Sequence, residues 1–245
     1  MSTAALLDGR RAIVYGGGGI GAVVARTFAR EGAAVHLAGR NRDRLEAAAA
    51  GVAEEGGATD VTVLDVLDEG AVRAHAEGVA AQGGLDVTIN LATRGDVQGT
   101  PLLDMDVEDF LRPIETGARA NFVTARAAAR LMVAQGSGVI LMIGSGSAGV
   151  LKPSPSFAMG GTGPADAASE SFMHYLAAEV GPSGVRVATL WTAGVFHPEQ
   201  MARVSMMGQG PTAEQFADTA AFVASDRGSG ITASIVNVSS GVSGH

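Results

Sequence analysis

The sequence predicts an α/β fold, in which a doubly wound sheet of seven parallel strands is covered by helices on both faces. Seven short apolar runs, most of them rich in β-branched residues, are typical of strands. The longer segments between them carry apolar residues three and four positions apart and end at glycines, as amphipathic helices do. Strands this apolar bury both faces, which a parallel sheet between two helical layers allows.

The predicted strands and helices alternate along the chain. The strands are residues 12–15, 34–38, 61–66, 87–92, 139–143, 185–191 and 234–238. The clearest helices are residues 20–30, closed by Gly32, and 41–55, closed by a pair of glycines. Such helices provide the right-handed crossovers that parallel strands require. The sequence contains no linker and no internal repeat, so we expect a single domain, 1–245.

The composition excludes several classes of protein. The chain has no cysteine, which excludes a disulfide framework, a thiolate nucleophile and a Cys-ligated zinc ion, and we expect a cytoplasmic protein without a metal site. A net charge of −8 does not suit nucleic-acid binding. No apolar run approaches the roughly 18 to 20 residues of a membrane span, and the first residues carry charge too early for a secretory signal. We therefore expect a soluble protein whose partner is a small-molecule substrate.

A glycine-rich turn follows the first predicted strand and opens the first predicted helix. It satisfies the pattern G-x-G-x-x-G through Gly16, Gly18 and Gly21, with Gly19 and Ile20 between them. Residues without a Cβ allow a tight turn and a close approach of backbone N–H groups to a pyrophosphate at a helix N-terminus. The strand–glycine–helix context favours a Rossmann-like dinucleotide site; the alternative is a glycine-rich turn that binds nothing.

The end of the second strand indicates which dinucleotide is bound. NAD-specific sites usually place Asp or Glu there, about 20 residues after the glycines, to bind the adenosine ribose. This chain has Gly39 followed by Arg40. A guanidinium offers a fixed fork of donors that suits a 2′-phosphate, so Arg40 predicts NADP(H) as the cofactor. The alternative is an ordinary solvated arginine.

The order of these motifs resembles the short-chain dehydrogenase/reductase family over essentially the whole chain. Asp65 and Val66, after the third strand, match the family's adenine-contacting pair, and residues 90–93 partly match its Asn-Asn-Ala-Gly motif. Segments similar to the family's late helices and strands are residues 176–179, 184–187, 222–226 and 231–232.

This resemblance implies further contacts and an assembly. Asn90 and Ala92 are expected to lie at the cofactor. Thr192 lies in the segment where family members place a Thr near the nicotinamide amide. Family members pack the helix that contains Phe172 and Tyr175 against its symmetry mate. We therefore expect a homo-oligomer, either a dimer or a tetramer.

The family's catalytic pair has no match in this chain. Family reductases use a Tyr as proton donor and a Lys four residues later, which lowers the pKa of the Tyr and holds the nicotinamide ribose. The tyrosines here, Tyr15 and Tyr175, have no Lys at that spacing. Aligned on residues 176–179, Thr162 takes the Tyr position and Asp166 the Lys position, at the cofactor. A threonine hydroxyl is far too weak an acid to replace a tuned phenol.

The family's serine, which polarises the substrate carbonyl, has two candidates here. Ser145 and Ser147 flank Gly146, which takes the matching position. Ser147 fits slightly better because the Ala-Gly that follows it matches the family. The alternative is that both serines only satisfy backbone groups of a tight turn. The family's helix asparagine corresponds to Gly117, and we assign a structural role to Asn121, one turn later.

Two further side chains are candidates for the missing proton donor. His197 follows the sixth strand near the cleft, and an imidazole titrates near neutral pH, which makes it the leading candidate. Lys152, on the loop after the serines, is the second. The alternative for each is a loop residue without a catalytic role. Residues 195–212 match the family's substrate flap, whose methionines predict either an adaptable apolar lid or ordinary packing.

The function predicted first is an atypical NADP(H)-dependent oxidoreductase that reduces a carbonyl or related unsaturated group of a small, apolar substrate. Its proton comes from His197, a serine or water, and because the cofactor carries the difficult step, a weak acid lowers the rate without abolishing the reaction. The alternatives are a non-redox enzyme on the same scaffold (isomerase, dehydratase or cyclase) and a catalytically inactive binding protein. The glycine motif, Arg40 and Asp65 favour retained nucleotide binding.

Overall fold

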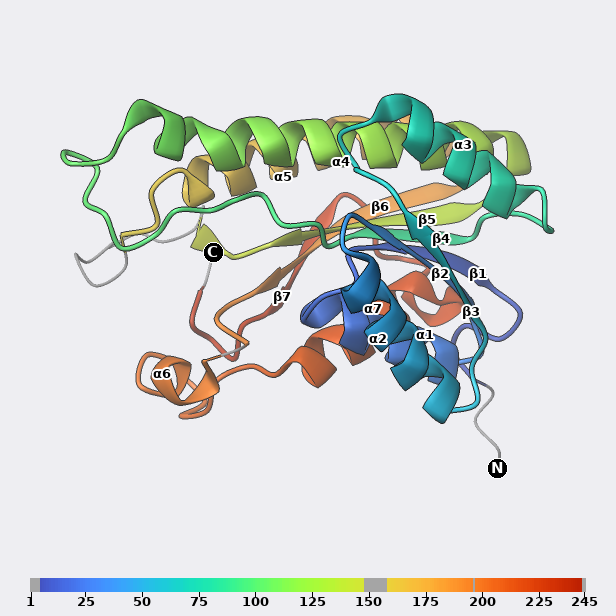
Figure 1. Ribbon diagram of the computed structural model, residues 1–245, viewed down its shortest axis with the longest axis horizontal. Helices are drawn as coiled ribbons and strands as arrows, with labels where there is room; N and C mark the ends of the chain where they lie inside the picture. The colour runs from blue at the N-terminus through green and yellow to red at the C-terminus, as the bar shows by residue number, and fades with distance from the viewer. Residues whose placement is uncertain (1–4, 148–157, 196, 244–245) are drawn as a thin grey trace.

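The computed structural model describes residues 5–147, 158–195 and 197–243. They form one seven-stranded sheet in the order β3-β2-β1-β4-β5-β6-β7, and every neighbouring pair is parallel. Helices cover both faces of the sheet (Figure 1). The predicted Rossmann-like α/β fold is confirmed.

Helices connect successive strands along the described part of the chain. The strands are β1 Arg11–Tyr15, β2 Ala34–Gly39, β3 Thr59–Val63, β4 Val87–Asn90, β5 Gly138–Gly144, β6 Val185–Thr192 and β7 Ser234–Val238. The α-helices are α1 Ile20–Arg30, α2 Arg42–Glu54, α3 Glu69–Ala80, α4 Val107–Gln135, α5 Thr162–Val180, α6 Pro198–Ala202 and α7 Ala213–Ala224, and two 3₁₀ turns are Gly181–Ser183 and Asp226–Gly228.

Two separate apolar cores lie on the two faces of the sheet. Along β1, Ala12 and Val14 belong to the core beneath α1, α2 and α7, whereas Ile13 and Tyr15 belong to the core beneath α3, α4 and α5. This alternation follows from the two-residue period of a strand. Because both faces are covered, the central strands are mostly apolar, as their sequences indicated.

The strand order places a switch point between β1 and β4. From β1 the chain continues through α1 to β2 on one side, and β4 lies on the other side. The loops that follow β1 and β4 therefore diverge, and in open α/β sheets this divergence opens the crevice that binds ligands.

One predicted strand is displaced in the sequence. The prediction of residues 61–66 is wrong at its end, because β3 is Thr59–Val63. Leu64 and Val66 continue the apolar pattern, yet they are buried loop residues of the second core. The backbone N–H of Leu64 still donates to the carbonyl of Gly39, at 3.0 Å, before the chain turns away from the sheet.

Within the described residues, no helix combines the length and the apolar character needed to cross a membrane.

Lowering the pH from 7 towards 4 is expected to destabilise the protein through His75. The imidazole of His75 lies edge-on to Tyr15, with ring centroids 6.2 Å apart, and its Nδ1 has no hydrogen-bond partner among the described residues. Burial, with a smaller contribution from nearby His36, lowers the pKa of His75 from 6.5 to about 4. The unfolded chain therefore binds this proton near pH 6.5 and the folded chain only near pH 4, so stability is lost as the pH falls through that window.

Thermal unfolding of wild type and His75→Gln at several pH values between 7.5 and 4 measures this loss. The melting temperature of the variant is expected to fall less steeply with pH than that of wild type. His174→Gln removes an exposed imidazole on α5 and serves as the control. Equal slopes for wild type and His75→Gln would contradict the assignment.

Candidate active site

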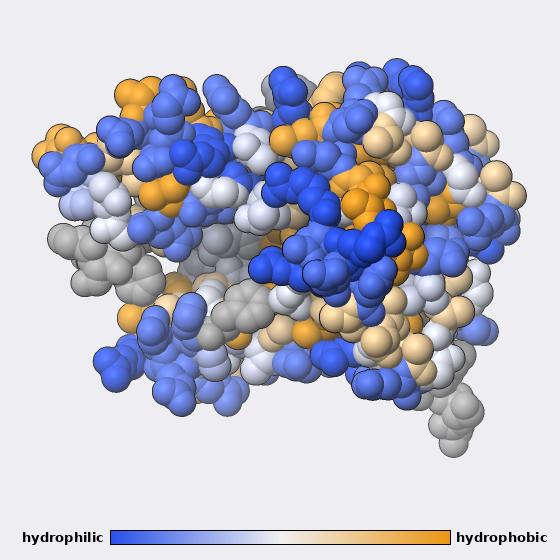
Figure 2. All heavy atoms as spheres, in the orientation of Figure 1, coloured by the Kyte–Doolittle hydropathy of each residue, from blue (hydrophilic) through white to orange (hydrophobic). Residues whose placement is uncertain are grey.

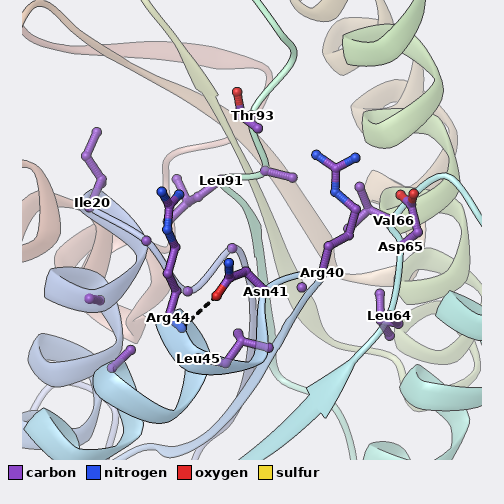
Figure 3. Close-up of a pocket in the computed structure, with 18 of the residues that line it drawn as sticks. Ile20, Arg40, Asn41, Arg44, Leu45, Leu64, Asp65, Val66, Leu91 and Thr93 are labelled. Atoms are coloured by element: carbon purple, nitrogen blue, oxygen red, sulfur yellow. Dashed lines mark hydrogen bonds between the residues drawn. The ribbon is translucent and has the colours of Figure 1, made fainter.

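A cavity of about 760 Å³ opens at the carboxyl ends of the central strands, within the range of small-molecule and cofactor sites. Its walls come from the loop after β1, the start of α2, and the loops after β3 and β4, with Thr116 of α4 and Ile143 of β5 at its inner end. Figure 3 shows several side chains that line it. The predicted cofactor residues that line it are Gly16, Gly18, Gly19, Ile20, Arg40, Asp65, Val66 and Ala92.

In the glycine turn, neighbouring backbone atoms pack so closely that two positions have no room for a side chain. A Cβ on Gly21 would lie 1.7 Å from the carbonyl oxygen of Gly16. Gly16 itself has φ +118, and a Cβ there would lie 2.9 Å from the carbonyl oxygen of Leu91. Since α1 begins at Ile20, its free backbone N–H groups lie at this turn, and such a helix terminus attracts a phosphate. The residues present therefore fit the pyrophosphate of a dinucleotide.

Two arginines line the cavity, Arg40 directly after β2 and Arg44 in the first turn of α2. Arg40 is exposed, and Figure 3 shows its guanidinium on the side of Val66, while that of Arg44 lies towards Ile20. Neither guanidinium makes a hydrogen bond or ion pair with another described residue. Asn41 caps the helix by accepting from the backbone N–H of Arg44 at 2.9 Å. Both positive charges are therefore available to an anionic ligand.

Sequence reasoning missed Arg44. The available signal was its spacing, because Arg44 stands four residues after Arg40 and near the N-terminus of a helix that Asn41 was expected to begin. The aliphatic part of its side chain runs beside the glycine turn, where a Cβ on Gly18 would lie 3.5 Å from the Arg44 Cδ.

Asp65, Asn90 and Thr192, which were also predicted at the cofactor, differ in their surroundings. Asp65 stays at the wall of the cavity, where its Oδ1 accepts from the backbone N–H of Leu67 at 3.0 Å and so fixes the turn after β3. Asn90 is buried behind the wall, and its Oδ1 accepts a hydrogen bond from the backbone N–H of Ala92 at 3.2 Å. The buried hydroxyl of Thr192, at the end of β6, has no hydrogen-bond partner among the described residues.

A chain of polar side chains connects β4 to α4 and α5. Asn90 Nδ2 donates to Asn121 Oδ1 at 2.7 Å, and Asn121 Nδ2 donates to Ser169 Oγ at 2.9 Å. Ser169 in turn donates to the carbonyl of Ala165. All of these side-chain groups are buried and satisfied, which gives Asn121 the structural role expected of it.

Asp166 is the centre of a second polar network, at the end of β5. Its Oδ2 accepts from Ser145 Oγ at 2.6 Å and from Ser147 Oγ at 2.9 Å, and it also accepts from the backbone N–H groups of both serines. The two serine oxygens are 2.8 Å apart. The Asp166 side chain is fully buried, whereas both serines are half-buried. Both predicted serines thus meet at one carboxylate.

Arg94 completes this network from the loop after β4. Its NH1 donates to Asp166 Oδ1 at 2.6 Å, and its NH2 donates to Asp96 at 3.1 Å. Burial by itself lowers the pKa of Arg94, but the charges of Asp166 and Asp96, with their hydrogen bonds, outweigh burial and raise it. The guanidinium is therefore charged, and it neutralises the buried carboxylate.

Gly117 on α4 makes room for Arg94. A Cβ at this position would lie 2.7 Å from the Arg94 Cδ. The family resemblance expects an asparagine here, and the space for that side chain is filled instead by the Arg94 stem. Sequence reasoning singled out Gly117 and Asp166 separately but missed Arg94, because nothing in the local pattern links the three positions.

The remaining predicted catalytic residues make no hydrogen bond to this cluster or lie outside the described residues. Thr162 is buried at the first residue of α5, and Gln98 Nε2 donates to its hydroxyl at 3.4 Å. His197 is exposed just before α6, and its side chain makes no hydrogen bond or ion pair with another described residue. Lys152 lies outside the described residues.

Comparisons with known proteins agree with this architecture. A family model described as enoyl-(acyl carrier protein) reductase matches residues 16–243. The chain is 32% identical over 250 residues to galactitol 2-dehydrogenase of Rhizobium johnstonii, covering 96% of this chain and 95% of that protein. It is 37% identical over 152 residues to gluconate 5-dehydrogenase of Gluconobacter oxydans, a match that spans 60% of this chain and only 57% of that enzyme. A solved short-chain type dehydrogenase/reductase from Mycobacterium ulcerans superposes with a TM-score of 0.88 at 26% identity, over 96% of this chain and 90% of that one.

Proposed function

The chain belongs to the short-chain dehydrogenase/reductase family, and from this membership we propose that it is an NADP(H)-dependent oxidoreductase with an atypical catalytic centre. It interconverts a carbonyl group and the corresponding alcohol of a small substrate. One observation carries the choice of cofactor: the unpaired guanidinium of Arg40 projects into a cavity whose floor is the glycine turn (Figure 3). When bound there, the nicotinamide supplies hydride transfer.

Different residues of this chain bind different parts of the dinucleotide. The glycine turn and the N-terminus of α1 hold the pyrophosphate, and Arg40 holds the 2′-phosphate with charge-assisted hydrogen bonds. Arg44, beside the glycine turn, adds a second positive charge. Asp65 and Val66 line the adenine end of the cavity. Among the described residues, no acidic side chain stands at the end of β2 to select the ribose of NAD.

The segment predicted to cover the substrate carries exposed apolar side chains. Met206 and Met207 follow α6 within the segment 195–212, and they are 90% and 63% exposed. Exposed methionines on the segment that the family resemblance assigns to the substrate flap suit an adaptable lid over an apolar substrate. Figure 2 shows polar and apolar residues interspersed over one face of the molecule.

A homo-oligomer, dimer or tetramer, is part of the proposal. Phe122 on α4 and Tyr175 on α5 are 45% and 78% exposed, and Phe122 packs edge-on to Phe172. Helices α4 and α5 lie on the face of the sheet opposite α1, α2 and α7 (Figure 1). The mass in solution, measured by light scattering, tests this part.

Wild-type protein is expected to bind NADPH more tightly than NADH, and Arg40→Ala to reduce this preference by about 10- to 100-fold, the effect of one or two charge-assisted hydrogen bonds. Calorimetric titration with each nucleotide measures it. Arg42→Ala is the matched control, because Arg42 is exposed and pairs with Glu46 outside the cavity wall.

Three outcomes of this titration separate the alternatives. A preference for NADPH that depends on Arg40 supports the proposal. Equal affinity of Arg40→Ala and wild type for NADPH would remove Arg40 from the site. Binding of neither nucleotide to wild type would overturn the oxidoreductase and leave a non-redox enzyme or a binding protein on the same scaffold.

A further inference from the structure

The serine–aspartate cluster at the end of β5 has a fixed hydrogen-bond polarity. Each serine hydroxyl carries one proton, and the Asp166 carboxylate carries none to give. The contacts from Ser145 Oγ and Ser147 Oγ to Asp166 Oδ2 therefore use the protons of the serines. The contact between the two hydroxyls needs one of the same two protons. Two protons thus serve three contacts inside the cluster, and neither is left for a ligand.

The oxygen atoms of these serines remain free as acceptors. A hydroxyl oxygen has two lone pairs, and both serines are half-buried rather than enclosed. A ligand with an O–H group can donate to them without disturbing the cluster. A carbonyl oxygen needs a donor, so one serine proton would have to leave the carboxylate. That step breaks a charge-assisted hydrogen bond, which is about twice as strong as a neutral one.

The surrounding residues keep Asp166 in this acceptor role. Arg94 NH1 donates to the other carboxylate oxygen, so the Arg94 and serine donors hold both oxygens. The backbone N–H groups of both serines, which can only donate, add two further bonds to Oδ2. A protonated carboxyl group would place its O–H against one of these donors. Every described group that hydrogen-bonds to Asp166 therefore donates to it.

The cluster lies next to the nucleotide cavity. Ile143 of β5 lines that cavity and stands two residues before Ser145. Thr93 lines it as well and immediately precedes Arg94. The serines and Arg94 therefore directly follow chain segments that form the cavity wall.

We propose that Asp166, anchored by Arg94, is a positioning residue that turns the hydroxyl protons of Ser145 and Ser147 away from the ligand, so that the site selects an alcohol over the corresponding ketone. The serines then accept the substrate O–H, which is the opposite of polarising a carbonyl. This inference rests on the proposed function, because its two ligands are the alcohol and carbonyl forms of one substrate. It makes the alcohol the more tightly bound of the two forms, whereas the sequence predicted a carbonyl substrate.

The test compares two probes of nearly equal shape, cyclohexanol and cyclohexanone, titrated into the nucleotide-free protein and followed by ligand-observed NMR. Wild type is expected to bind cyclohexanol about fivefold more tightly, the ratio that corresponds to one net hydrogen bond. In Asp166→Ala, the acceptor of both serine protons is removed, so these protons are free to donate to a ligand. The preference for cyclohexanol is expected to disappear or reverse in this variant.

Two further variants guard against misfolding and a general charge effect. Ser145→Ala/Ser147→Ala keeps the Arg94–Asp166 pair and removes both acceptors, and it is also expected to lose the preference. Asp218→Asn removes an exposed carboxylate that pairs with Arg30, and it is expected to keep the preference of wild type.

Several results would overturn the inference. They are equal or tighter binding of cyclohexanone by wild type, binding of neither probe, or an unchanged preference in the double serine variant. Calorimetry with NADPH on the same samples reports the proposed function separately. A wild type that binds NADPH and prefers cyclohexanone defeats only the inference, whereas one that binds no nucleotide and prefers cyclohexanol defeats only the proposed function.

Discussion

Arg94→Met is expected to lower the free energy of unfolding by about 3 to 5 kcal/mol, the usual result of removing one partner from a buried ion pair. The Asp166 side chain is fully buried and the Arg94 side chain is 14% exposed, so water cannot replace the lost guanidinium. The serine and backbone donors on Oδ2 remain, but the charge of the carboxylate is then uncompensated. Denaturation by urea, at one fixed protein concentration, measures the loss.

A double variant distinguishes this explanation from lost packing. Arg94→Met/Asp166→Leu removes both charges, and since apolar replacement of a buried pair is often neutral or stabilising, it is expected to recover most of the stability. If Arg94→Met alone lowered the free energy of unfolding by less than about 1 kcal/mol, the pair would behave as a surface ion pair. The buried network described for Asp166 would then be incorrect.

Gly21→Ala is expected to weaken NADPH binding by about 100-fold or more, equivalent to roughly 3 kcal/mol. The new Cβ would lie 1.7 Å from the carbonyl oxygen of Gly16, and a backbone atom cannot move aside as the end of a side chain can. The turn between β1 and α1 must therefore open. The N–H groups that face the phosphates move with it. Calorimetric titration with NADPH measures the change.

Gly78→Ala is the matched control for this substitution. Gly78 lies within α3, and a Cβ there has no atom within 4 Å. Removing a glycine from the interior of a helix is expected to stabilise the protein by up to about 1 kcal/mol and to leave NADPH affinity unchanged. Unaltered NADPH binding by Gly21→Ala would show that the turn tolerates a side chain and that its shape does not determine the cofactor site.

Much of the fold could be predicted because its signals are local. Helix 20–30 matches α1 residue for residue, and the strand 234–238 matches β7. The end of β3 could not be predicted in the same way. Leu64 and Val66 are apolar because they reach the second core from a loop, and an apolar pattern alone does not separate such residues from a strand.

The candidate site was predictable where one contiguous motif makes it. The glycine turn and Arg40 follow directly from the sequence, and both line the cavity. The Asp166 network is different, because its donors come from positions 94, 145 and 147, which only the fold brings together. The sequence did identify both serines and Asp166 as candidates. The polarity of their hydrogen bonds depends on distances that no linear pattern contains.

The space above Gly117 has an evolutionary consequence. A chain with a lysine at position 166 would place two cations together as long as Arg94 remained. A chain with an asparagine at position 117 would displace the Arg94 stem, because even a Cβ there would lie 2.7 Å from it. Each substitution alone therefore creates a buried like-charge pair or a steric clash. The three positions are therefore epistatic, and descendants of this protein are expected to keep or lose Gly117, Arg94 and Asp166 as a set.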